Sequence, residues 1–337
     1  MTCQAKEGVC AEAAGLGNDG KFPVIGDAVG LTAAQALSEP ITQGSLNTKH
    51  TGGMYSDKTT FAGFNVINQI MQAPSTFPNR ASVAEVFGTV EQIEEAPQGG
   101  KFIYVDGHRH YALPGFDTTV KTGDSVEPGD QLSAGIVDVK DIIRLRGLGE
   151  GRQHYVNRLE QAFNDSGMQV DRRNLEYLAR GALDQVRVTG NEGLGDNLPD
   201  DLVSYNKLNH GYNPPATSKV GNVGDSIGKY LETPALHYSI GTKLTPRMVS
   251  ELNESGVKRV FTSEDKPKFE PLMTMLSRST KHNEDWLAKM HDTYLGASLK
   301  DDSVIGADTD IEQNIHFAPR LAYGDNFGDK ARTTGKF

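Results

Sequence analysis

The chain has 337 residues, of which 37% are hydrophobic and 23% are charged, and its formal net charge is −10. This composition is typical of a soluble globular protein of more than one domain, and the negative charge argues against a large nonspecific nucleic-acid surface. A local basic patch, and with it direct nucleic-acid binding, stays open. No apolar run approaches the roughly 20 residues that span a bilayer, so we expect no membrane contact and a cytoplasmic protein, or one that enters a particle assembled there.

Two cysteines, Cys3 and Cys10, stand near the N-terminus. Two are too few for a disulfide framework in a chain of this length. They are also too few for a structural zinc site, which needs four ligands.

Residues 26–53 predict a helix followed by a hinge. Ala33 and Ala34 are good helix formers and are small enough to let another backbone approach closely. Pro40 is expected to end or bend the helix, because it lacks the N–H donor and its ring clashes with the preceding turn. The stretch 43–50 is mostly polar, and we expect it to switch between loop and helix.

This stretch, GDAVGLTAAQALSEPITQGSLNTKHTGG, resembles the start of the trigger loop in the β′ subunit of multisubunit RNA polymerases, whose pattern reads roughly GEAVGxxAAQSxGEPxTQLTxRTFHxGG. In that family the loop closes a helical hairpin over the incoming nucleotide. The resemblance implies a catalytic role for His50 and substrate contacts by Gln43, Leu46 and Asn47, on condition that the chain works in a polymerase. Asn47 stands where the family has arginine, so a guanidinium fork for phosphate oxygens is missing. The alternative is that His50 is an ordinary surface or packed histidine.

The cysteines extend the resemblance. Their spacing matches a zinc-binding stretch of the same family, in which a third cysteine takes the position of Ala13. We therefore interpret Cys3 and Cys10 as the relic of a lost zinc site and expect no cofactor in this chain. The resemblance implies magnesium only through a partner subunit.

The run FAGFNVINQIMQAP predicts a second helix, with Ile67, Ile70 and Met71 on one face and Pro74 as its end. It resembles the second arm of the trigger-loop hairpin. From the residues alone, this is an ordinary antiparallel helix pair.

Residues 82–137 predict short strands. Asp106-Gly107 indicates a two-residue hairpin turn, and two further Gly-Asp steps follow at 123–124 and 129–130. The family has a similar barrel-sandwich unit after its trigger loop. No lysine hairpin motif of a biotinyl or lipoyl carrier is found here, so a carrier function is disfavoured. His108 and His110 share one face of a strand, but without a third ligand we expect an exposed strand and no metal.

From residue 138 the pattern is helical and still resembles the family up to about residue 188. Tyr155, Leu159 and Phe163 lie on one helical face, and Gly167 is a natural end for that helix. Asp171 is expected to cap the next helix.

The remaining residues predict a linker and a further domain. We expect a strand at 237–241, a helix that starts at Thr245-Pro246 and ends at Gly256, a strand at 257–262, and helices at 269–276 and 283–294. Trp286 anchors the last helix and, with Ala33 and Ala34, is a predicted interface residue. The last 40 residues or so, rich in glycine and aspartate, predict an extended arm.

The chain is thus predicted to be α+β and to divide into five parts. These are a degenerate zinc segment with a trigger-loop-like helical hairpin (1–80), a small barrel-sandwich β unit (81–137), a helical segment (138–190), a linker (191–225), and a separate small α/β C-terminal domain with an extended arm (226–337).

Two functions follow from this reading. The first, which the lost arginine and the lost zinc ligand favour, is a β′-derived fragment of bacteriophage type reused as a non-catalytic assembly protein of a virion. The second is the trigger-loop-bearing subunit of a split DNA-directed RNA polymerase, with nucleotidyl transfer in trans. Both predict a protein assembly, homo- or hetero-oligomeric, and the second predicts other polymerase subunits as partners.

Overall fold

The computed structural model describes residues 8–17, 20–27, 29–50, 64–72, 79–190, 193–195 and 197–273, together with Cys3 and Ala5. For residues 41–50 it describes the helical backbone alone. Trp286, the expected helix at 283–294 and the C-terminal arm lie outside the described residues.

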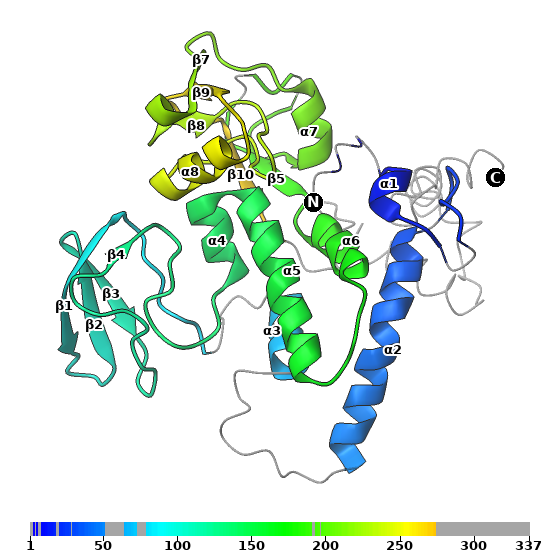
Figure 1. The fold of residues 1–337 in the computed structure, drawn as a ribbon, viewed down its shortest axis with the longest axis horizontal. Coiled ribbons are helices and arrows are strands. Elements are labelled where there is room, and N and C mark those ends of the chain that lie inside the picture. Colours follow the sequence, from blue (N-terminus) through cyan, green and yellow to red (C-terminus); the bar gives the residue numbers. More distant parts are fainter. Residues whose placement is uncertain are drawn as a thin grey trace, which may run out of the picture.

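The fold is a mixed α+β arrangement in which a curled, half-barrel β unit lies on one side of a layer of helices (Figure 1). Two small sheets lie above the helices in this view, and a long helix lies on the side away from the β unit. Among the helices that the structure describes, none combines the length and apolar character that a membrane crossing requires.

The β unit contains β1 (Gly88–Glu95), β2 (Lys101–Val105), β3 (His108–Ala112) and β4 (Ser125–Val126) in the order β3-β2-β1-β4. The predicted hairpin is confirmed. Asp106 and Gly107 link β2 to β3 with φ angles of 47° and 74°, the two positive values that a type I′ turn requires. The expectation that this strand is exposed is wrong for His110, which is 7% exposed and accepts a hydrogen bond from the backbone N–H of Glu85 at 3.0 Å.

The two Gly-Asp steps form equivalent turns. Asp124 accepts a hydrogen bond from the backbone N–H of Lys121, and Asp130 accepts one from Glu127, each at 2.8 Å. The turn-rich β unit expected from the sequence is therefore present, and its core is made of buried aliphatic side chains.

The helical layer contains α3 (Phe64–Gln72), α4 (Val139–Arg146), α5 (Leu148–Asp165) and α6 (Arg172–Ala182). The largest core lies among these helices and includes Ile67, Ile70, Tyr155 and Phe163, each at most 1% exposed. The predicted apolar faces of α3 and α5 are confirmed. Asp171 caps α6 as expected, because its side chain accepts a hydrogen bond from the backbone N–H of Arg173.

A second sheet follows, in the order β10-β5-β6, from β5 (Gln185–Val188), β6 (Leu202–Ser204) and β10 (Phe269–Leu272). The helix expected at 269–276 is wrong in its described part, since these residues form β10 and pair with β5. Phe269 is 2% exposed and contacts the rings of Tyr205 and Tyr212, and its backbone pairs with Val188 of β5, which favours an extended strand here. Residues 191–225, expected as a linker, carry β6, α7 (Tyr205–Gly211) and β7 (Lys219–Asn222).

The third sheet has the order β7-β9-β8, with β8 (Tyr230–Leu231) and β9 (Arg259–Ser263), and α8 (Pro246–Glu254) packs beside it. Thr245 caps α8 as predicted. The strand expected at 237–241 is wrong. Ala235 and Tyr238 exchange two backbone hydrogen bonds across a tight turn, in which Leu236 has a φ of 53°. This turn stops an extended segment before residue 239.

Candidate functional site

The helix α2 (Val29–His50) carries the residues that the resemblance assigns to nucleotide contact (Figure 1). Pro40 was expected to end or bend the helix. An end is wrong, because α2 continues through Pro40 for a further ten residues, whereas a bend stays a prediction. A proline removes one hydrogen bond and crowds the preceding turn, but this cost need not end a helix whose earlier residues, such as Ala33 and Ala34, are good helix formers. The hydroxyl of Ser38 donates to the carbonyl oxygen of Gln35 in the turn before the proline, at 3.0 Å.

A continuous helix brings the four assigned positions together. Gln43, Leu46, Asn47 and His50 follow the repeat i, i+3, i+4, i+7 and therefore share one stripe of α2. At about 100° per residue, this stripe lies about a third of a turn around the helix from the positions of the buried residues nearer its start.

Those buried residues are Ala33, which is 1% exposed, and Leu37, which is 3% exposed. They lie one turn apart, and α2 packs mainly on α6 and to a smaller extent on α3. Ala34 is exposed. Of the two alanines predicted at an interface, one is thus covered by the chain itself and the other is open to a partner, and their role toward a partner stays a prediction.

The two cysteines lie close together at the N-terminal end. The thiol sulfur of Cys3 accepts a hydrogen bond from the backbone N–H of Cys10 at 3.3 Å, and the sulfur of Cys10 accepts one from Ala13 at 3.4 Å, which caps the short helix α1 (Ala11–Ala14). Burial raises the pKa of the Cys3 thiol, but the hydrogen bonds to its sulfur and the charge of Arg180 more than offset this, so that the net pKa lies below its usual value.

These cysteines do not fit a structural zinc ion. The third ligand position is Ala13, and within the described part of the chain no group of three or more histidine, cysteine, aspartate or glutamate side chains is placed to hold a metal. The same finding holds for the pair His108 and His110.

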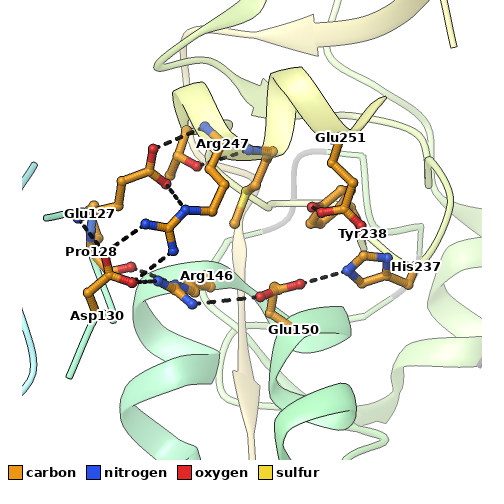
Figure 2. Close-up of polar contacts among 11 residues, drawn as sticks. Glu127, Pro128, Asp130, Arg146, Glu150, His237, Tyr238, Arg247 and Glu251 are labelled. Atoms are coloured by element: carbon orange, nitrogen blue, oxygen red, sulfur yellow. Dashed lines mark hydrogen bonds and ion pairs between the residues drawn. The ribbon is translucent and has the colours of Figure 1, made fainter. Parts of the chain in front are cut away.

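A polar cluster joins the β unit, the helical layer and α8 (Figure 2). Asp130 of the β unit accepts hydrogen bonds from Arg247 of α8 and, at 2.6 Å, from Arg146 of α4. The guanidinium of Arg146 also donates to the carbonyl oxygen of Pro128 at 2.7 Å, and the backbone N–H of Arg247 donates to Glu127 at 3.0 Å. Two arginines thus hold one turn of the β unit against two different helices.

The cluster continues toward the turn that follows β8. Glu150 of α5 contacts His237 at 2.6 Å, and the hydroxyl of Tyr238 donates to Glu251 of α8 at 2.6 Å (Figure 2). Each of these carboxylates is engaged by a partner on another element. The arrangement is suited to fixing the relative positions of the elements and offers no free nucleophile and base pair.

A shallow pocket lies beside His237, between the first turns of α5, helix α7 and the turn at 234–239. Arg152 and Tyr205 line it, but both already have partners. Arg152 donates to Leu183 and Asp184, and the hydroxyl of Tyr205 accepts from the backbone N–H of Ile240.

The assignment of Gln43, Leu46, Asn47 and His50 on α2 stays a prediction, and the polar cluster of Figure 2 was not predicted from the sequence. Asp130 meets Arg247 across 117 residues of sequence, and no local pattern marks such a pair.

Residues 2–102 match the family model described as RNA polymerase Rpb1, domain 5. The chain is also similar to proteins described as DNA-directed RNA polymerase subunit β′. It is 33% identical to that of Leifsonia xyli over 221 residues, which is 63% of this chain and 17% of the relative. With that of Lysinibacillus sphaericus it shares 31% identity over 214 residues, 62% of this chain and 17% of the relative. With that of Mycoplasma genitalium it shares 30% over 200 residues, 57% of this chain and 15% of the relative.

The matches support a relationship to multisubunit RNA polymerases. More particularly, they support a fragment related to the C-terminal part of the β′ subunit. The chain spans about a sixth of the length of these relatives.

Proposed function

We propose that this chain is the trigger-loop-bearing subunit of a split multisubunit DNA-directed RNA polymerase, acting in trans with a subunit that holds magnesium. The observation that carries the proposal is the similarity to β′ subunits over 63% of the chain, together with a family-model match that includes α2 and α3. The virion assembly role that the sequence analysis favours gains no support from these comparisons.

The geometry supports the proposal because buried residues of α2 and α3 hold these two helices on the rest of the fold. We call these buried residues the packed base of the helical pair. Ala33 and Leu37 are buried on α2, and Ile67 and Ile70 of α3 are fully buried in the main core. The stripe from Gln43 to His50 lies on the half of α2 that is further from this packed base. In Figure 1 that half of α2 extends to the lower edge of the molecule, away from the β unit. Such a helix can present one stripe to a ligand or to a partner subunit.

In this role His50 is the ionisable group that approaches the triphosphate, as a proton donor or a charge-stabilising contact. Asn47 offers an amide in place of a guanidinium, so it adds no charge. In β′ subunits the carboxylates that hold magnesium lie in an NADFDGD-like motif, which does not occur in this sequence, so in this proposal a partner subunit supplies them.

The test is to purify the full chain with an affinity tag from the cells that make it and to identify every co-purifying polypeptide by mass spectrometry. We expect a subunit with an NADFDGD-like carboxylate motif in stoichiometric amount, and template-dependent incorporation of ribonucleotides by the assembly. An assembly that lacks this subunit and makes no RNA would overturn the proposal. If that assembly were a virion part, the non-catalytic role would replace it.

A further inference from the structure

Two arginines on one face of helix α6 contact the N-terminal segment, by which we mean the described residues from Cys3 to Leu16. Arg173, Tyr177 and Arg180 follow the spacing i, i+4, i+7 and share one helical face. Arg180 is only 8% exposed, and its guanidinium donates to the carbonyl oxygens of Cys3 at 3.1 Å and Ala5 at 2.6 Å. A buried guanidinium is thus satisfied by two carbonyls from a segment 175 or more residues away.

Arg173 makes a similar contact with residues nearer the end of the N-terminal segment. Its guanidinium donates to the carbonyl oxygens of Ala14 at 3.2 Å and Leu16 at 3.4 Å, while Asp171 holds it from the other side at 2.7 Å. Gly15 lies between the two carbonyls with a φ of 71°, and a Cβ atom there would overlap the guanidinium. The close approach of Arg173 therefore depends on a glycine at this position.

We propose that Arg173 and Arg180, through their contacts with Cys3, Ala5, Ala14 and Leu16, anchor the N-terminal segment to α6 without metal, in place of the structural zinc that the cysteine spacing suggests. The anchor consists of four charge-assisted hydrogen bonds. Each of the two guanidinium groups donates to two backbone carbonyl oxygens. Lysine could not reproduce this geometry, because its ammonium is a single point of charge.

The helix that holds the N-terminal segment also supports α2. The N-terminal segment leads into α2, and α2 packs on the same helix α6. Figure 1 shows α1 beside the upper end of α2, close to α6. Helix α6 is thus the common support of the N-terminal segment and of the first half of α2.

The experiment is hydrogen exchange of the full chain, read at the amides of Ala14 and Gly15. These amides donate to Cys10 and Ala11 within the four-residue helix α1, which is too short to be stable alone. They are therefore protected only while the segment is docked. We expect no stoichiometric zinc by elemental analysis and unchanged exchange in the presence of 1,10-phenanthroline.

Arg180→Met and Arg173→Met should each accelerate exchange at these amides by about tenfold or more, the range for loss of hydrogen bonds to a charged donor. The matched control is Arg172→Met. Arg172 is the neighbour of Arg173 on α6 but pairs with Glu160 and Asn157 instead of the N-terminal segment. It should leave the exchange of Ala14 and Gly15 unchanged.

Gly15→Ala keeps α6 intact and tests the anchor if an arginine variant does not fold. It should accelerate exchange at the same amides, because the added methyl displaces Arg173 and because alanine is strained at a φ of 71°. One tightly bound zinc per chain, faster exchange with chelator, or wild-type exchange in Arg180→Met or Gly15→Ala would each overturn the inference.

Discussion

The guanidinium of Arg247 on α8 binds both carboxylate oxygens of Asp130 in the β unit, with nitrogen–oxygen distances of 2.9 and 3.0 Å. Asp130 is 21% exposed at its side chain, and Arg146 contacts it from α4. One carboxylate therefore connects three parts of the fold (Figure 2).

Asp130→Asn is predicted to destabilise the protein, because it leaves two guanidinium groups facing each other without the charge between them. We expect the free energy of unfolding at pH 7 to fall by about 1–3 kcal/mol, between the values for exposed and buried ion pairs. Urea unfolding measures this change. The matched control is Glu85→Gln, which breaks the exposed pair with Arg144 and should cost less than about 1 kcal/mol. Equal effects of the two variants would contradict the prediction.

The same carboxylate predicts an acid-dependent loss of stability. Burial raises the pKa of Asp130, but the hydrogen bonds and charges of Arg247 and Arg146 outweigh it, so that the net pKa lies below the ordinary value. The contribution of Asp130 is therefore fully present above the unfolded-state pKa of about 3.9 and is lost as the pH falls through the folded-state pKa. Asp130→Asn should make urea unfolding less sensitive to pH below about 4.

Glu232 is predicted to change the stability of the protein with pH in the direction opposite to that of Asp130. Glu232 is 1% exposed and accepts a hydrogen bond from the hydroxyl of Tyr212 at 2.5 Å. Burial raises its pKa, and the charge of Asp265 adds to this. Its stabilising contribution is fully present below the unfolded-state pKa of about 4.3 and is lost as the pH rises through the raised folded-state pKa.

A glutamine at position 232 keeps a polar side chain and cannot ionise. The loss of stability that Glu232 causes at rising pH should therefore disappear in this variant. Urea unfolding between pH 4 and pH 9 should show a smaller decline in Glu232→Gln than in the wild type. A decline of equal size in both proteins would show that Glu232 is not the group responsible. Tyr212→Phe, which removes the donor, should lower stability at every pH of this range.

Local patterns in the sequence predicted the elements whose causes are local. The turn at Asp106-Gly107 and the cap by Asp171 each depend on residues next to them. The strand β10 was missed because Phe269 owes its conformation to pairing with β5, 81 positions earlier at Val188. The contact of Arg180 with Cys3 crosses 177 positions, and no spacing rule reports on it.

The assignment of the candidate site from the sequence rests on the resemblance of residues 26–53, which places Gln43, Leu46, Asn47 and His50. The structure adds that α2 is continuous, so that these positions share one stripe. The helix end expected at Pro40 is wrong because the rule that proline breaks a helix states a cost in free energy, and α2 continues past Pro40 in spite of that cost.

Ala33→Leu and Ala34→Leu form a matched pair of variants on α2. Ala33 is 1% exposed and faces the chain's own interior, so a leucine there should overpack the site and lower the free energy of unfolding by about 1–3 kcal/mol. Ala34 is exposed, and the same change should alter the stability of the isolated chain by less than about 0.5 kcal/mol. Chemical denaturation distinguishes the two. If Ala34 meets a partner subunit, Ala34→Leu should instead weaken co-purification of that partner.

The last prediction tests the proposed function through His50. In a working polymerase, His50→Ala should slow RNA synthesis by the assembled complex on the order of ten- to a thousandfold, the range for a lost proton donor or charge-stabilising contact. The matched control is Lys49→Ala, since Lys49 is adjacent in sequence but lies about 100° around α2 and outside the stripe of Gln43, Leu46, Asn47 and His50. Both variants should assemble normally, because neither changes Ala33 or Leu37, which are the buried residues among the described side chains of α2. Single-nucleotide incorporation by the purified complex measures the rate. A wild-type rate in His50→Ala would remove His50 from the nucleotide site, whereas equal slowing in both variants would point to a general requirement for the helix.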